Sequence, residues 1–360
     1  IDDDVDISNE AFPFGTSQPL TIAGIDTLAI RLTYVGELGW EIYVAKEQAV
    51  ALHDALDAGR GWFGDRVPLR YAAVTLLTTD GEPEPLAASV RQMHEALAGR
   101  LGFWSGVAPP VRMLLASQLV KHGDSAEAFI AELDRIREQF RAAGVRRGGV
   151  YEVLGVLVLR RVLRGQPVES EHVARFKAIY SELKRHHWFL TGPDDYPACA
   201  MLVGQPGEPR VIGDEIEAVY QALRTDAALW SGEALQTAAN VLYLTHMAPT
   251  EVAGRFAELA AGFKAAGYRV RQPDYDEIAV LCFLATPADK IIATVMGYLH
   301  QMRDRLSWVS KRMGLSLAAS LAFVRLVDGD PRLGAVADAK LLLDMQAIVA
   351  ARQAAAAAAA

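Results

Sequence analysis

Apolar residues follow a helical period through most of the chain. Four mostly apolar positions with the spacing i, i+4, i+7 and i+11 recur six times, at intervals of 43, 43, 40, 40 and 39 residues. This spacing places side chains on one face of a helix, and a nearly constant interval indicates an internal repeat. The six sets begin at Leu86, Phe129, His172, Ile212, Val252 and Ile291.

A second series of segments lies between these amphipathic helices and is apolar on nearly all sides. A helix of that kind is buried between layers. The pattern therefore predicts a mainly α fold, in which about six to seven α-hairpins of about 40 residues stack into a solenoid. The second series consists of Leu69–Thr78, Met113–Val120, Tyr151–Leu163, Ala198–Val203, Leu235–Leu244, Tyr275–Leu284 and Leu315–Val327.

The beginning of the chain has a different period. Apolar residues alternate from Leu28 to Tyr34 and again from Trp40 to Val44, which predicts a β-hairpin. Residues Lys46–Ala58 then have a helical stripe. We expect a small α+β segment over residues 1–60, the helical repeat over 68–330, and a C-terminal helix with a low-complexity alanine tail over 331–360.

Four tryptophans follow the amphipathic helices at repeat-related positions: Trp104, Trp188, Trp230 and Trp308. We interpret each as a wedge that packs its hairpin turn against the next unit. The alternative is that these aromatic side chains line a ligand groove.

Charged loops also recur. The motifs GPDDYP (192–197) and QPDYDE (272–277) lie two repeats apart, and we interpret their aspartates as helix N-caps. The alternative is an acidic lip that binds a basic peptide or a cation. Asp124 and Glu127 have the spacing of a capping box. Gly148 and Gly149, which follow two arginines, form a turn, because no strand precedes them to make a phosphate loop.

Composition narrows the possible partners. The net charge is −8, and no cluster of basic and aromatic residues stands out, which argues against nucleic acid and anionic membranes. The two cysteines lie in apolar stretches, as expected of buried thiols in a reducing cytoplasm. No catalytic or metal-binding motif occurs. The adjacent His186 and His187 point in different directions on a helix, so we expect no metal there.

Residues 3–59 carry a specific resemblance. The block SNEAFPF, the hairpin TYVGELGWEIYV and the following helix resemble, in order and spacing, the folate-binding aminomethyltransferase domain of the glycine cleavage T-protein, as found in dimethylglycine and sarcosine dehydrogenases. The resemblance implies a tetrahydrofolate site in which Tyr34 and Glu41 approach the pterin, with Glu37 at the hairpin tip. Residues 70–330 resemble an uncharacterised bacterial helical family, which implies architecture and no chemistry.

Two hypotheses follow from the sequence. The first is a helical-repeat scaffold whose groove binds a protein or peptide, with a fragment of a folate-binding domain at its amino end and no catalytic residues. The second is a folate-dependent one-carbon transfer or demethylating enzyme without its upstream half. The T-protein family pattern continues on both sides of residues 3–59, and this chain departs from it after the hairpin helix.

Overall fold

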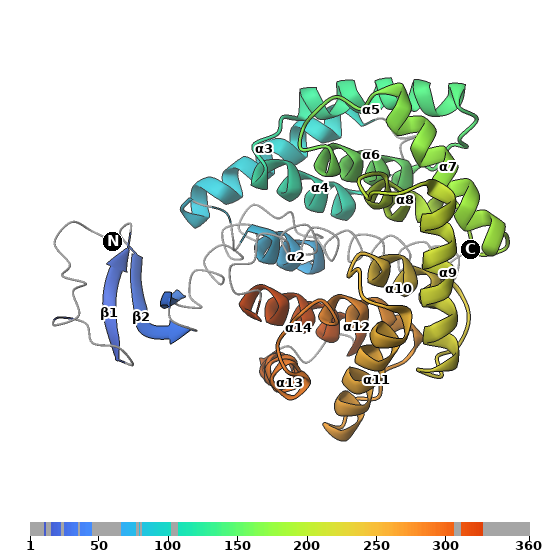
Figure 1. The fold of residues 1–360 in the computed structure, drawn as a ribbon. Coiled ribbons are helices and arrows are strands. Elements are labelled where there is room, and N and C mark those ends of the chain that lie inside the picture. Colours follow the sequence, from blue (N-terminus) through green and yellow to red (C-terminus); the bar gives the residue numbers. More distant parts are fainter. Residues whose placement is uncertain are drawn as a thin grey trace. The chain divides into compact units, whose positions relative to one another are not determined.

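A computed structural model describes residues 11, 16–22, 25–34, 37–44, 66–76, 79, 81–101, 107–305 and 311–326. The chain divides into two compact units, Ile1–Gln92 and Met93–Ala360. The structure is mainly helical, as the sequence predicts (Figure 1). The expected helix at Lys46–Ala58 and the expected C-terminal helix over 331–360 lie outside the described residues.

The first unit contains a three-stranded antiparallel sheet. Its strands are β1 (Ser17–Ile22), β2 (Ile25–Tyr34) and β3 (Glu37–Val44), in the order β1-β2-β3. The register places Tyr34 opposite Glu37 and Ile30 opposite Glu41. Helix α2 (Arg66–Leu76) follows, with Leu69, Ala72 and Leu76 buried.

The remaining helices alternate between two kinds. Helices of the first kind are amphipathic and 17 or 18 residues long: α3 (Pro83–Arg100), α5 (Ala126–Ala142), α7 (Ser170–His186), α9 (Pro209–Thr225), α11 (Pro249–Ala265) and α13 (Ala288–Arg305). Between them lie α4 (Pro109–Lys121), α6 (Val150–Val162), α8 (Tyr196–Val203), α10 (Glu233–Tyr243), α12 (Tyr275–Leu281) and α14 (Lys311–Leu326). We call the first kind outer helices and the second kind inner helices.

Each helix packs against its counterpart in the next pair. From α5 onward, every outer helix contacts the next outer helix, and from α6 onward every inner helix contacts the next inner helix. Figure 1 shows α7, α9 and α11 as successive neighbours. The inner helices are buried because they lie between their own outer helix and the adjacent inner helices. Every residue of α8, for example, is buried.

Two arginines make similar hydrogen bonds in different helix pairs. Arg175 on α7 donates to the carbonyl oxygens of Val203, Gln205 and Gly207 at 3.0, 2.5 and 2.9 Å. Arg255, 80 residues later on α11, donates to the carbonyls of Leu284 and Thr286 at 3.2 and 2.6 Å. In both cases the guanidinium satisfies carbonyls that the end of an inner helix leaves without partners.

Two local predictions are wrong. The N-cap of α5 is Ser125, whose hydroxyl accepts the Ala128 N–H at 3.1 Å, whereas Asp124 forms an ion pair with Arg160. His172 does not belong to the apolar stripe of α7: its Nδ1 accepts the Glu169 N–H at 2.9 Å, and the neighbouring Val173 is buried in its place. A histidine one turn into a helix can satisfy a backbone donor that has no helical partner.

No helix in the described part of the chain is long and apolar enough to cross a membrane.

Candidate functional site

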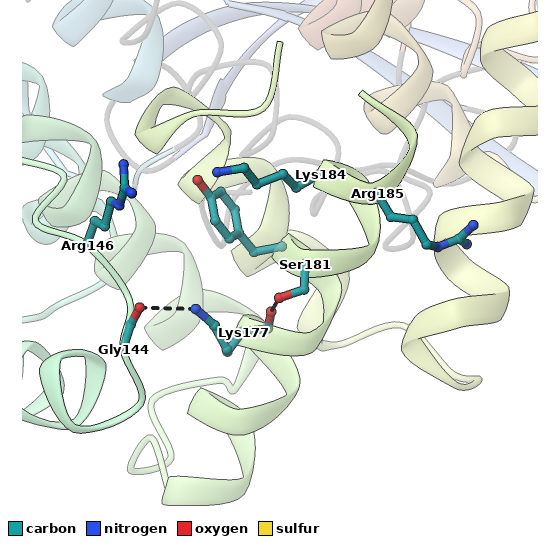
Figure 2. A pocket seen from close by; sticks show the side chains of 7 residues that line it. Gly144, Arg146, Lys177, Ser181, Lys184 and Arg185 are labelled. Carbon is teal, nitrogen blue, oxygen red and sulfur yellow. Dashed lines mark hydrogen bonds between the residues drawn. The ribbon is translucent and has the colours of Figure 1, made fainter. Parts of the chain in front are cut away.

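A pocket of about 530 Å³ lies between the loop after α5 and the exposed face of α7. On α7 the residues that line it recur every three or four positions, so they share the face opposite the buried Phe176, Ile179 and Leu183. None of its described lining residues is acidic. We call it the cationic pocket; it is lined by Gly144, Arg146, Lys177, Tyr180, Ser181, Lys184 and Arg185 (Figure 2).

The four cations of the cationic pocket are not equivalent. Lys177 donates to the Gly144 carbonyl at 3.0 Å and so provides a hydrogen-bond partner for a backbone oxygen just after the end of α5. Arg185 points away toward α9, where it pairs with Asp214 at 2.6 Å (Figure 2). Among the described residues, Arg146 and Lys184 have no carboxylate partner, and Lys184 Nζ lies 6.0 Å from the centre of the Tyr180 ring. These two cations are therefore available to an anionic ligand.

The loop that carries Arg146 is held in place by buried groups. The Tyr196 hydroxyl donates to the Arg146 carbonyl at 3.0 Å, and the Glu152 carboxylate accepts the Gly148 N–H at 2.9 Å. Arg141 bridges the same carboxylate and the Val145 carbonyl. Burial raises the pKa of Tyr196 well above its usual range, so the phenol remains a hydrogen-bond donor. The pocket wall is thus preorganised.

Tyr196 itself is fixed by aromatic packing. Its ring lies 5.5 Å from Phe176 and 5.4 Å from Tyr180, in edge-to-face geometry with both. A Cβ added at Gly148 would lie 2.7 Å from the Tyr196 ring. Glycine at this position is therefore required by the close approach of the loop to the ring.

Two of the tryptophans are exposed. Trp188 and Trp230 have exposed fractions of 62% and 77%, and Phe189, whose ring lies 3.4 Å from that of Trp188, is 80% exposed. The wedge prediction is wrong for both tryptophans, because in the part of the chain that the structure describes no neighbouring unit covers them. Trp104 and Trp308 lie outside the described residues. Trp188 and Phe189 come just after α7, and Lys184 lies in the last turn of α7. Exposed aromatic side chains and a cationic side chain therefore come from the same end of one helix.

Asp195 and Asp274, from the two repeated loops, cap the short 3-10 helices Pro193–Asp195 and Gln272–Asp274, and not the α-helices α8 and α12 that follow them. Asp195 accepts the Gly192 N–H at 2.9 Å, and Asp274 accepts the Arg271 N–H at 2.9 Å, each three residues back along the chain. Asp195 also accepts from Gln236 at 3.1 Å, and Asp274 from the Tyr268 hydroxyl at 3.3 Å. Both aspartates are buried. They close tight turns and do not form an exposed acidic lip.

Burial also changes the acidity of these loops. Removal from water, with the charge of Asp194 as the next cause, raises the pKa of Asp195 to about 8. His186 and His187 lie against different carboxylates, Asp214 at 3.1 Å and Glu217 at 2.7 Å. Among the described residues no group of three or more His, Cys, Asp or Glu side chains is arranged to hold a metal ion.

The three residues implied by the T-protein resemblance lie in the sheet of the first unit. Tyr34 ends β2 directly opposite Glu37, and Glu41 lies four residues farther along β3. Opposite residues of an antiparallel pair share a face, and residues along a strand alternate between faces. The register therefore places all three positions on one face of the sheet.

Two of the four cations, Lys177 and Lys184, follow a spacing that is visible in the sequence, but we did not identify them as a site. Lys177, Tyr180 and Lys184 recur at helical spacing opposite the buried stripe of α7. The contribution of Arg146 was not readable, because it depends on Tyr196, which lies 50 residues away.

Two family models match successive parts of the chain and meet between residues 74 and 77, close to the change of period. Residues 1–74 match the family described as "GCVT N-terminal domain". The chain is 34% identical to human mitochondrial sarcosine dehydrogenase over 144 residues, which are 40% of this chain and 14% of that protein. It is 45% identical to human mitochondrial dimethylglycine dehydrogenase over 51 residues, which are 14% of this chain and 6% of that protein. The chain thus spans a small part of these relatives.

The helical part has a different relative. A Bacillus subtilis (strain 168) protein described as "Uncharacterized protein YeaA" is 23% identical over 228 residues, which are 62% of this chain and 68% of that protein. No solved structure matches the chain significantly. Residues 77–354 match the family described as "Protein of unknown function (DUF4003)". Since that match covers more than half of the chain, the chain belongs to this family and carries ahead of it a segment similar to the GCVT N-terminal domain.

Proposed function

We propose that this chain is a helical-repeat binding protein whose cationic pocket binds an acidic segment of a partner protein. The exposed aromatic side chains of Trp188 and Phe189, which follow α7 in the sequence, contribute to the same binding surface. The observation that carries the proposal is the composition of the pocket: four cations and, among its described lining residues, no acid, in a chain of net charge −8. Local positive charge on an acidic protein steers and orients an oppositely charged segment.

A solenoid of α-hairpins is the architecture that we propose for the helical part. Two observations support it: the alternation of outer and inner helices about every 40 residues, and the contacts of each helix with its counterpart in the next pair. Such arrays present extended surfaces built from successive repeats. Trp188 and Trp230 come from equivalent positions in two consecutive pairs, so one extended peptide could touch both.

A protein segment fits this surface better than nucleic acid or a membrane. Nucleic acids and anionic membranes bind to broad basic surfaces. The basic surface here is narrow, because Arg185 at the margin of the pocket is neutralised by Asp214 and Glu182. Exposed tryptophan and phenylalanine are typical of peptide-binding surfaces, because they supply large contact area at low entropic cost. A cytoplasmic location also belongs to this proposal and is supported by Cys199 and Cys282, which are buried free thiols.

Fluorescence anisotropy of a short glutamate-rich peptide with one central leucine tests the proposal. The full chain should bind this peptide and not its lysine-rich counterpart, and Arg146→Glu or Lys184→Glu should weaken binding at least about tenfold. Lys290→Glu, an exposed lysine on α13, is the matched control and should bind as the unaltered chain does. Equal binding of all variants would contradict a role for the cationic pocket.

A second candidate function is tetrahydrofolate binding by the first unit, as part of one-carbon transfer or demethylation. The match of residues 1–74 to the GCVT N-terminal domain favours it, and so does the register that puts Tyr34, Glu37 and Glu41 on one face. A carboxylate at position 41 could accept two neighbouring pterin N–H groups, which is an orienting, charge-assisted pair.

Calorimetric titration of the full chain with tetrahydrofolate tests this second candidate. Glu41→Ala should reduce the affinity, because it removes both proposed hydrogen bonds. Glu84→Ala, an exposed glutamate on α3, is the control for a general loss of charge. Absence of binding, or binding that Glu41→Ala leaves unchanged, rejects the hairpin as a folate site.

A further inference from the structure

A second cavity, of about 540 Å³, opens where α4 and α6 end side by side. It is separate from the cationic pocket, because the two share no lining residue. Its polar lining comes from Gln118 and His122 near the end of α4, Asp124 in the following loop, and Arg160, Arg161 and Arg164 near the end of α6. We call it the arginine cavity.

Two buried donors in the arginine cavity lack an acceptor. Arg161 donates to Gln118 Oε1 at 3.2 Å. This hydrogen bond fixes the orientation of the amide, whose Nε2 is a donor that needs its own acceptor. Gln118 is only 3% exposed, and neither Gln118 Nε2 nor Arg160 Nε has a hydrogen-bond partner among the described residues. A buried N–H without an acceptor costs about 1 to 3 kcal/mol. Both donors therefore favour an acceptor supplied from outside the chain.

The backbone at the mouth of the cavity is also unusual. Arg164 has φ of 53°, in the left-handed region where glycine is preferred, and it is exposed. Arginines at the end of a helix are ordinarily explained by the helix dipole. The dipole does not require an arginine at a position where its Cβ is unfavourable, and it supplies no acceptors for the two buried donors.

The charges define the ligand. Burial, followed by the nearby charges of Arg161 and Lys121, lowers the pKa of His122 to about 3, so the imidazole is neutral at pH 7. Three arginines against the single carboxylate of Asp124, which pairs with Arg160 at 2.5 Å, leave the described lining with two excess positive charges. A phosphate monoester carries about −1.5 to −2 charges at pH 7 and three acceptor oxygens. A cavity of this volume suits a small molecule.

We propose that the arginine cavity is a binding site for the phosphate group of a small phosphorylated metabolite. The phosphate oxygens accept from Gln118 Nε2, Arg160 Nε and the guanidinium of Arg164, and the remainder of the molecule occupies the rest of the cavity. The site is independent of the cationic pocket and of the folate candidate.

Arg164→Gly gives a test that separates binding from folding. Glycine removes the cation and relieves the left-handed backbone, so the variant should be as stable as the unaltered chain or more stable. Ala228→Gly is the matched control, because Ala228 is exposed, also has φ of 53°, and carries no charge. It should gain stability in the same way without any change in phosphate affinity.

The full chain and both variants are titrated calorimetrically with inorganic phosphate, free phosphoserine, a short phosphoserine peptide and acetate. We expect saturable binding of phosphate and phosphoserine, weakened at least about tenfold by Arg164→Gly and unchanged by Ala228→Gly. The ring resonance of His122 should shift on phosphate addition, because an anion beside the imidazole changes its environment. That shift places the ligand in the cavity.

Three outcomes overturn the proposal. Phosphate affinity that is unchanged in Arg164→Gly excludes the site. Acetate binding as tight as phosphate binding shows that any small anion is accepted. A phosphoserine peptide that binds while free phosphoserine does not would assign the cavity to a protein partner.

Discussion

Replacement of Trp230 by alanine should cost little stability although tryptophan is the largest side chain. Trp230 is 77% exposed, so only about a quarter of a surface of roughly 250 Å² is removed from water. At roughly 25 cal/mol per Å², that burial contributes at most about 1.5 kcal/mol to the free energy of unfolding. Phe256 on α11 is fully buried, and Phe256→Ala should cost about 3 to 5 kcal/mol.

Urea unfolding of the full chain, followed by far-ultraviolet circular dichroism, measures the difference. Trp230→Ala and Trp188→Ala should both have unfolding midpoints near that of the unaltered chain, and Phe256→Ala should have a much lower midpoint. If Trp230→Ala lowers the free energy of unfolding as much as Phe256→Ala does, Trp230 is wedged between repeats. The exposed aromatic surface that the proposed function uses would then not exist.

Three further predictions concern the groups that hold the site. Burial raises the pKa of Asp195 from 3.8 to about 8, so the stabilising contribution of its protonated form is fully present below pH 4 and is lost as the pH rises to 8. The free energy of unfolding should therefore fall by up to about 1.4 kcal/mol per pH unit in this window. Urea titrations of Asp195→Asn over the same pH range should not show this fall. Gly148→Ala should cost about 1 to 3 kcal/mol in thermal unfolding because its Cβ meets the Tyr196 ring, whereas Gly254→Ala, with open space around its Cβ, should be neutral or stabilising. Arg175→Ala should lose about 1 to 3 kcal/mol with its three carbonyl partners, and an equal loss in the exposed Arg210→Ala would show that the effect is one of charge.

The positions of the helices could be predicted because the spacing of apolar residues along the chain determines which face of each helix is buried. Predicted stripe residues such as Phe129, Leu133 and Phe140 are fully buried, and so are most residues of the uniformly apolar inner helices. The interpretation failed at His172, where the need to satisfy a backbone N–H at the helix start outweighed the expected core position. Helix ends are set by such local hydrogen bonds, which periodicity does not describe.

The site could be predicted only in part. The stripe of Lys177 and Lys184 on α7 is visible as spacing, but which cations remain unpaired depends on other helices, as the pairing of Arg185 with Asp214 on α9 shows. The exposure of Trp188 and Trp230 was misjudged because the burial of an aromatic side chain in a loop depends on which residues the next helix pair places over it. Likewise, the aspartates at 195 and 274 bond backward because each ends a short turn that the sequence does not specify.

Charge exchange at the cationic pocket tests the central claim most directly. The full chain with Arg146→Glu and Lys184→Glu together is titrated with the glutamate-rich peptide and with its lysine-rich counterpart. The proposed function predicts that the double variant loses the glutamate-rich peptide and gains the lysine-rich one, because the same surface then carries the opposite charge. A double variant that retains its affinity for the glutamate-rich peptide would contradict the claim that this pocket is where an acidic segment binds.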